Sequence, residues 1–142
     1  TDHSARCTDE HADGRILIGT VAGDIHDIGK NAACLTLSSF GFTVKDLGVD
    51  VSPQRFLEEA KTFSPHIIGL SGLLSTAFNS MRDTVTLLRE RADELAVRPA
   101  MIIGGGTIDE HVARFVGADR WTTDAMDGVR LCQHLLESRR QE

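Results

Sequence analysis

The sequence lacks the features that mark several common classes of protein. It has three cysteines, Cys7, Cys34 and Cys132, with no Cys-x-x-Cys pair. Cys34 and Cys132 fall on apolar faces of expected helices, where we expect reduced, packed thiols. No apolar run is long enough to span a bilayer, and the polar start shows no signal peptide. The formal net charge of -6 leaves no excess of basic residues for a nucleic acid. These absences predict a cytoplasmic protein with neither a nucleic-acid nor a membrane partner.

Length and composition are those of one globular domain. The chain has 142 residues, of which 41% are hydrophobic and 25% charged, enough for a sizeable core. Residues 1–14 have few apolar side chains and no periodicity. We therefore expect a flexible polar lead-in over 1–14 and a single domain over 15–142, without internal repeats.

Short apolar segments alternate with segments of helical periodicity. The expected strands are Ile16–Val21, Thr43–Leu47, His66–Ser71, Met101–Ile103 and Arg120–Thr122. The expected helices are Lys30–Phe40, Pro53–Phe63, Phe78–Leu95, Ile108–Val116 and Ala125–Arg139. Because the strands are almost wholly apolar, helices should cover both faces of the sheet. The alternation predicts an α/β fold, a doubly wound, flavodoxin-like (Rossmann-type) sheet of five parallel strands in the order 2-1-3-4-5.

Three loops of unusual composition follow the first, third and fourth strands. They are Gly23–Gly29, Ser71–Ala77 and Gly104–Thr107. In this architecture ligands bind at the carboxyl ends of the strands, where these loops meet. The first loop carries Asp24, His26 and Asp27, the second small hydroxyl side chains, and the third three consecutive glycines. Together they predict a deep slot for a large ligand.

His26 is the candidate metal ligand in this slot. An imidazole on a loop, with a carboxylate two residues before it, is typical of a ligand with an acidic hydrogen-bond partner. Each loop alone has a simpler explanation, since glycine runs form turns and a serine after a strand is often a cap. The coincidence of the three loops at one sheet edge favours the ligand site.

These motifs resemble the three-part signature of cobalamin-binding domains, D-x-H-x-x-G, S-x-L and G-G. The three motifs occur in that order, beginning at Asp24, Ser71 and Gly104. The resemblance extends from about Arg15 to Leu136. The longer string GDIHDIGKN is most similar to the methyltransferase branch, which includes cobalamin-dependent methionine synthase and the corrinoid proteins of methanol, methylamine and O-demethylation systems.

The resemblance implies cobalamin as the cofactor, bound in the base-off/His-on mode. His26 would be the lower axial ligand of cobalt, and Asp24 would accept a hydrogen bond from its other ring nitrogen, so these two would be the catalytic pair. The nucleotide tail would enter the slot between the sheet and the helices. The implied cofactor contacts are Gly23, Asp24, Ile25, His26, Asp27, Ile28, Gly29, Ser71, Leu73, Ser75, Gly104, Gly105 and Ala125.

Two features depart from the family pattern. Where methionine synthase extends the Asp–His pair with a serine, this chain has Ala77, so Ser75 or Thr76 would substitute, or the relay would end at Asp24 and water. The methyltransferase-type proteins also carry a preceding helical bundle that caps the corrin, and residues 1–14 are too short and polar to form it. Either the chain is a fragment or a partner covers the upper face.

The leading hypothesis is a corrinoid protein that carries a methyl group on cobalt and is not a complete enzyme alone. Its partners would be methyl-donor and methyl-acceptor methyltransferases and a reductive activator. The alternatives are the small subunit of an adenosylcobalamin mutase, and a non-catalytic cobalamin sensor or storage module. A metal hydrolase that uses Asp24, His26 and His111 is a further, more distant alternative.

Overall fold

The structure is a computed structural model that describes residues 14–140, except the side chain of Arg140. Five parallel strands form one sheet in the order β2-β1-β3-β4-β5, which confirms the predicted order. The strands are β1 (Arg15–Thr20), β2 (Thr43–Asp46), β3 (Ile67–Ser71), β4 (Ala100–Gly104) and β5 (Arg120–Thr122). Cys7 and the predicted lead-in up to residue 13 lie outside the described residues.

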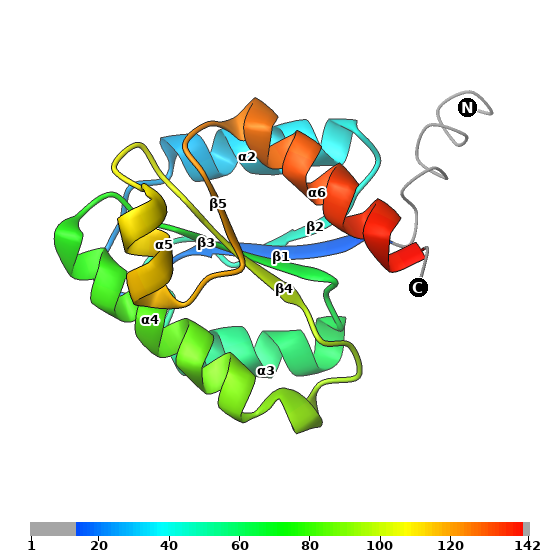
Figure 1. Ribbon diagram of the computed structural model, residues 1–142, viewed down its shortest axis with the longest axis horizontal. Coiled ribbons are helices and arrows are strands. Elements are labelled where there is room, and N and C mark those ends of the chain that lie inside the picture. The colour runs from blue at the N-terminus through cyan, green and yellow to red at the C-terminus, as the bar shows by residue number, and fades with distance from the viewer. Residues whose placement is uncertain (1–13, 141–142) are drawn as a thin grey trace.

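Helices cover both faces of the sheet (Figure 1). The helices are α2 (Ile28–Ser39), α3 (Pro53–Phe63), α4 (Ser75–Glu90), α5 (Glu110–Val116) and α6 (Ala125–Arg140), with a 3-10 turn, η1 (Ala92–Glu94), after α4. One face carries α2 and α6, and the other carries α3, α4 and α5. This arrangement confirms the doubly wound fold and accounts for the apolar strands.

The ends of most elements lie within two residues of the predicted ends, but the helix expected over Phe78–Leu95 is wrong at both ends. It begins at Ser75, because the backbone N–H groups of Leu73 and Leu74 donate to a carboxylate about 50 residues earlier in the chain. It ends at Glu90, where Arg91 leaves helical geometry with φ -107° and ψ 22°. The Ser71–Ala77 loop is therefore shorter than predicted, and its last three residues are helical.

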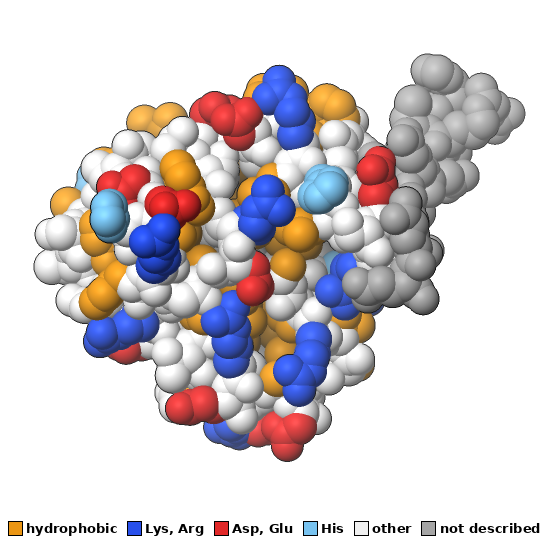
Figure 2. All heavy atoms as spheres, in the orientation of Figure 1, with side chains coloured by type: hydrophobic (Ala, Val, Ile, Leu, Met, Phe, Trp, Pro, Cys, Tyr) orange, Lys and Arg blue, Asp and Glu red, His pale blue; other side chains and the backbone are white. Residues whose placement is uncertain are grey.

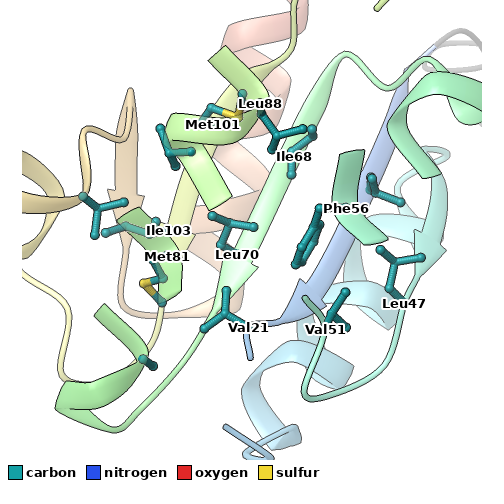
Figure 3. Packing of buried hydrophobic residues seen from close by; sticks show 14 of the residues in the cluster. Val21, Leu47, Val51, Phe56, Ile68, Leu70, Met81, Leu88, Met101 and Ile103 are labelled. Carbon is teal, nitrogen blue, oxygen red and sulfur yellow. The ribbon is translucent and has the colours of Figure 1, made fainter. Parts of the chain in front are cut away.

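The larger core lies between the sheet and α3, α4 and α5 (Figure 3). Phe56 of α3 and Met81 and Leu88 of α4 are fully buried against strand residues such as Ile68 and Ile103. Burial of each such side chain contributes about 1.5–3 kcal/mol. This core holds β1, β3 and β4 in register and so fixes where their carboxyl ends meet.

The start of α3 shows how local sequence and this packing agree. The Ser52 hydroxyl accepts the backbone N–H of Arg55 at 3.1 Å, and Pro53 takes the first helical position. A serine cap followed by proline is a common helix start, and the predicted helix Pro53–Phe63 is confirmed.

The second core lies between the sheet and the pair α2 and α6. Ile16, Ile67 and Ile102 of the strands pack against Leu37 of α2 and Cys132 of α6. Fewer large side chains contribute here than on the opposite face. This is the face that contains the cavity described below.

Basic and acidic side chains are intermixed on the face seen in Figure 2, over α4, α5 and α6. No continuous basic area is visible there, as the net charge of -6 leads one to expect. Within residues 14–140, no helix combines the length and apolar character needed to cross a bilayer.

Candidate functional site

The loop between β1 and α2, residues 21–27, is held in place by contacts at its beginning. The Asp24 N–H donates to the Val21 carbonyl at 3.1 Å and closes a turn in which Gly23 has φ +85°, a conformation that favours glycine. Asp50, in the loop after β2, accepts the Gly23 N–H at 2.8 Å and donates its own N–H to the Asp24 carbonyl at 3.0 Å. These contacts determine where Asp24 and His26 lie.

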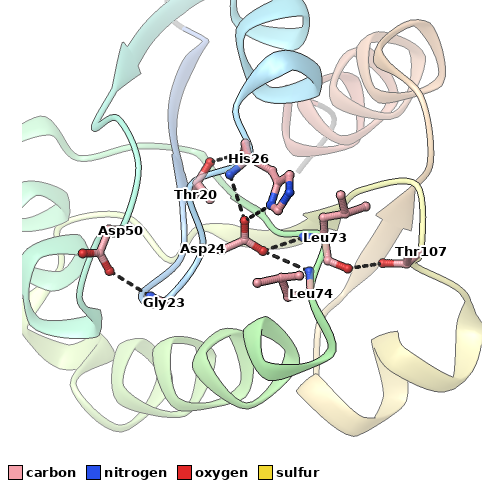
Figure 4. A network of polar contacts seen from close by, with 8 residues as sticks. All are labelled: Thr20, Gly23, Asp24, His26, Asp50, Leu73, Leu74 and Thr107. Carbon is pink, nitrogen blue, oxygen red and sulfur yellow. Dashed lines mark hydrogen bonds and ion pairs between the residues drawn. The ribbon is translucent and has the colours of Figure 1, made fainter.

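Asp24 is a buried carboxylate with both oxygens occupied (Figure 4). Its Oδ1 accepts the backbone N–H of His26 at 2.9 Å and lies 2.7 Å from the imidazole Nδ1. Its Oδ2 accepts the N–H groups of Leu73 at 2.8 Å and Leu74 at 3.0 Å. The carboxylate thus joins the loop after β1 to the start of α4, where negative charge is favourable.

The same contacts keep Asp24 ionised. Burial raises the pKa of a carboxyl group, but the N–H groups of Leu73, His26 and Leu74 and the His26 ring together outweigh burial. They hold the pKa of Asp24 well below its usual range. At neutral pH the site therefore contains a permanent negative charge beneath the imidazole.

His26 is fixed at three points and yet remains half exposed. Asp24 binds its ring and its N–H, and the buried Thr20 hydroxyl donates to its carbonyl at 3.0 Å. Because an ionised carboxylate only accepts, Nδ1 is the donor in this contact, and in a neutral ring the lone pair is then on Nε2. The side chain is 49% exposed, and Nε2 has no hydrogen-bond partner within the described residues. This nitrogen is free to bind a metal.

The loops after β3 and β4 lie against each other beside this imidazole. The Thr107 hydroxyl donates to the Leu73 carbonyl at 2.9 Å. A Cβ at Gly105, where φ is +153°, would lie 2.2 Å from the Gly72 carbonyl oxygen, so only glycine permits this approach. The three loops predicted to converge at the carboxyl edge do so.

Ala77 lies close to Asp24 but offers no hydroxyl. Ala77 is buried, and Gly72 lies between it and Asp24. A Cβ placed on Gly72 would be 2.8 Å from the Ala77 Cβ and 3.6 Å from the Asp24 Oδ2. Ser75 and Thr76 are exposed on the first turn of α4, and in the described part of the chain neither hydroxyl binds Asp24. Within residues 14–140, no Ser or Thr side chain extends the Asp24–His26 pair, and the backbone N–H groups of Leu73 and Leu74 are the donors to the other oxygen of Asp24.

A cavity of about 150 Å³ lies between the sheet and the helices α2 and α6. Its floor is apolar, with Ile16, Ile67 and Leu37 among its lining residues. Toward the carboxyl edge it is lined by Ser71 and by the glycines of the loop after β4. The cavity and the half-exposed His26 thus lie at the same end of the sheet.

The wall of the cavity includes a buried cation that the sequence did not reveal. The Lys30 ammonium group lies 2.9 and 2.7 Å from the two carboxylate oxygens of Asp46 and 2.6 Å from the Asn31 side-chain oxygen. Its side chain is 2% exposed, against 36% for Asp46. Burial opposes ionisation of Asp46, but Lys30 and the Gly48 N–H lower its pKa. The pair joins the start of α2 to the end of β2.

Eight of the predicted cofactor contacts fall into two groups. Asp24, His26 and Leu73 meet at the Asp24 carboxylate. Five others line the cavity: Gly29, Ser71, Gly104, Gly105 and Ala125. Of the rest, Ile25 and Ile28 are exposed beside His26, at 72% and 87%, Gly23 forms the turn, Asp27 precedes α2, and Ser75 begins α4.

Several residues that shape the site were not singled out from the sequence. Thr20 and Asp50 hold the His26 loop, and Gly69 and Gly128 line the cavity. One signal was available for Gly69, since a glycine in the middle of a central strand often marks the close approach of a ligand or another chain segment. The hydrogen bonds of Thr20 to the His26 carbonyl and of Asp50 to the Gly23 N–H depend on how the backbone folds, which no sequence motif indicates.

The three-residue hydrolase site is not formed. Among residues 14–140, no three His, Cys, Asp or Glu side chains are grouped closely enough to hold a metal ion. His111 is exposed on α5, and the Asp24 oxygens are occupied by N–H donors. A single axial ligand to a metal already held by a macrocycle requires no such cluster.

Comparison with known proteins agrees with this geometry. The family described as the B12 binding domain matches residues 14–130. Dimethylamine corrinoid protein 2 of Methanosarcina acetivorans is 38% identical over 123 residues, which is 87% of this chain and 56% of that protein. Dimethylamine corrinoid protein 3 of Methanosarcina mazei is 39% identical over 123 residues, 87% of this chain and 72% of that protein. The chain therefore spans from just over half to about three quarters of these relatives.

A solved structure gives the same result. A cobalamin-binding protein from Desulfitobacterium hafniense superimposes with a TM-score of 0.81 and 42% identity, covering 86% of this chain and 58% of that one. The resemblance inferred from the three motifs is confirmed, and with it the corrinoid cofactor of the family. The chain belongs to the B12-binding domain family.

Proposed function

We propose that this chain is the corrinoid-binding part of a methyl-transfer system and holds cobalamin with His26 as the lower axial ligand. The observation that carries the proposal is the arrangement of His26, with Nδ1 bound to a buried, ionised Asp24 and Nε2 exposed. A histidine ligand whose other ring nitrogen donates to a carboxylate is the usual metal-binding arrangement.

The residues present suit a cofactor with a displaced nucleotide tail. His26 offers one nitrogen at the edge of the sheet, and the cavity of about 150 Å³ opens toward the same edge. Ile25 and Ile28, exposed beside the imidazole, provide apolar surface for the macrocycle. Ser71, Gly104 and Gly105 line the entrance of the cavity and would contact the tail.

In this proposal the protein binds and orients, and cobalt supplies the methyl-transfer chemistry. Asp24 retains the Nδ1 proton and so makes Nε2 a stronger donor. Thr20 and Asp50 keep the ring in place while partners exchange above it. The partners would be a methyl-donor and a methyl-acceptor methyltransferase and a reductive activator, in the cytoplasm.

The proposal is tested first by cofactor binding. The purified chain is mixed with hydroxocobalamin and desalted, and its visible spectrum is recorded beside that of free cofactor. We expect retained cobalamin with a spectrum shifted by histidine ligation. The His26→Ala protein should bind more weakly and lose the shift. The matched control is His111→Ala, which removes an exposed imidazole on α5.

An unchanged spectrum for His26→Ala would contradict ligation by this residue. The methyl-carrier role is tested separately, by adding labelled methyl iodide to the reduced, cofactor-loaded protein. Label should stay with the protein through gel filtration and move to a thiol acceptor on addition of a partner methyltransferase. Label that never associates with the loaded protein would favour a sensor or storage module.

A further inference from the structure

The sheet wall of the cavity loses side-chain volume toward the carboxyl edge. On the face toward α2 and α6, the first row of paired residues contains Ile16 and Ile67. In the next row Gly69 of β3 lies between Ile18 and Ile102, and in the last row Ser71 pairs with Gly104. All seven residues line the cavity. The hollow therefore results from the order of large and small residues along three neighbouring strands.

The helices α2 and α6 show the same order, with small residues near the entrance of the cavity and larger residues deeper in. In α6, Ala125 and Gly128 line the cavity near its entrance, and Cys132 lines it one turn deeper. These positions are three and four residues apart, so they share one face of the helix. In α2, Gly29 and Ala33 line the cavity above the larger Leu37. Small residues thus line the entrance on α2, α6, β3 and β4, together with Lys30 and residues 122–124.

Backbone geometry does not require two of these glycines. Neither Gly69 nor Gly128 has a positive φ. A Cβ at Gly128 would make only an ordinary contact, 3.7 Å from the Thr122 Cγ2, and alanine is the better helix former. A Cβ at Gly69 would lie 3.3 Å from the Ile18 side chain. The contact at Gly69 is tighter than usual, so close packing against Ile18 also favours glycine there, whereas at Gly128 the missing side chain provides only room in the cavity.

Two polar side chains of the cavity wall, Lys30 and Thr122, already have partners, and the hydroxyl of Ser71 lies at the carboxyl edge and not in the deep part. The Lys30 ammonium group lies between 2.6 and 2.9 Å from three acceptor oxygens, and the Thr122 hydroxyl donates to a backbone carbonyl two residues on. The deep part is lined by Ile16, Leu37 and Cys132. A polar group that enters the deep part loses water and gains no hydrogen bond.

We propose that this cavity selects among corrinoids by the chemistry of the lower base, a proposal that rests on the corrinoid binding proposed above. It accepts an apolar aromatic base such as dimethylbenzimidazole and disfavours a base with polar ring-edge groups, such as adenine. Gly69 and Gly128 provide the space for the ring. The selectivity arises because the polar ring-edge atoms of such a base would find no hydrogen-bond partner in the deep part of the cavity. It does not arise from a steric clash between the base and the cavity wall.

The test compares three corrinoids on the intact chain by visible titration. They are cobalamin, the analogue with adenine as lower base, and cobinamide, which lacks the nucleotide. We expect cobalamin to bind at least about tenfold more tightly than either, a difference of about 1.4 kcal/mol. Equal affinity for cobalamin and the adenine analogue would overturn the selectivity but leave cobalamin binding intact. Failure to bind any of the three would overturn both proposals.

The variant Gly128→Ala tests the role of the cavity directly. We expect a higher melting temperature for the free protein, since alanine favours the helix. We also expect cobalamin affinity to fall by roughly fivefold or more because a methyl group occupies the cavity, with cobinamide affinity unchanged. Ser138→Ala, on the exposed face of α6, should stabilise the helix without changing either affinity. Unchanged cobalamin affinity in Gly128→Ala, or equal losses for both corrinoids, would contradict the inference.

Discussion

Asp24 holds His26 twice, since its Oδ1 lies 2.7 Å from the ring Nδ1 and 2.9 Å from the backbone nitrogen of the same residue. One carboxylate oxygen therefore sets both the position of the loop and the direction of the imidazole. Its other oxygen ties the same unit to α4 through two N–H groups. Replacement of this carboxylate should affect ligation and stability together.

Asp24→Asn should weaken retention of cobalamin by roughly 10–100-fold, as is usual when the hydrogen-bond partner of a metal-bound histidine is lost. The side-chain amide would place N–H groups against other N–H donors, so the free energy of unfolding should also fall by about 1–3 kcal/mol. Cofactor titration and urea unfolding measure the two effects. Asp83→Asn, at an exposed position of α4, serves as the control and should change neither quantity.

The ionisation of Asp24 should make part of the stability depend on pH. Its pKa is lower in the folded chain than the value of about 3.9 in an unfolded one. The contribution is therefore complete above about pH 4 and is lost as the pH falls through the folded pKa. The difference in unfolding free energy between wild type and Asp24→Asn should be constant near neutrality and shrink in acid. A difference that grows in acid would contradict this assignment.

The Lys30–Asp46 pair should respond unequally to removal of its two members. Asp46→Asn leaves a buried ammonium group without its anion and should cost about 3–5 kcal/mol. Lys30→Met leaves a carboxylate that is 36% exposed and reaches water, so its cost should be smaller. Urea unfolding of both variants measures the order. A larger loss for Lys30→Met would show that the unpaired ammonium group is not the costlier of the two.

Two neighbouring glycines of the loop after β4 should differ sharply in tolerance. Gly105→Ala places a Cβ 2.2 Å from the Gly72 carbonyl oxygen at φ +153° and should destabilise by at least about 1–3 kcal/mol. Gly106→Ala meets no atom within 4 Å and should change stability by less than about 0.5 kcal/mol. Thermal unfolding of the two variants tests the contrast. Equal losses would contradict the close approach of the two loops.

Strand order and the location of His26 follow from local patterns in the sequence. Apolar strands such as Ile67–Ser71 alternate with helices, and crossover handedness limits the possible topologies. The motif at Asp24 and His26 directly follows one such strand, so the sheet edge could be predicted. Ser52 and Pro53 likewise mark a helix start within four residues of sequence.

Contacts between segments that are distant in the sequence cannot be predicted from local patterns. The start of α4 depends on Leu73 and Leu74 donating to Asp24, and a local window places the helix three residues too late. Lys30 of α2 is charged, yet it is buried because Asp46 at the end of β2 lies against it. The cavity depends on which glycines face α6 and α2, and this is decided by register.

The three contacts that hold His26 have a consequence for association with a ligand. The hydrogen bonds that fix the imidazole are formed within the chain before any ligand binds. They come from Asp24, from Thr20 and, through the turn at Gly23, from Asp50. Binding therefore need not order this loop, and little conformational entropy is lost there on association. Heat capacity and entropy changes on binding should then report mainly the apolar surface buried along the cavity and the movement of the ligand's own tail.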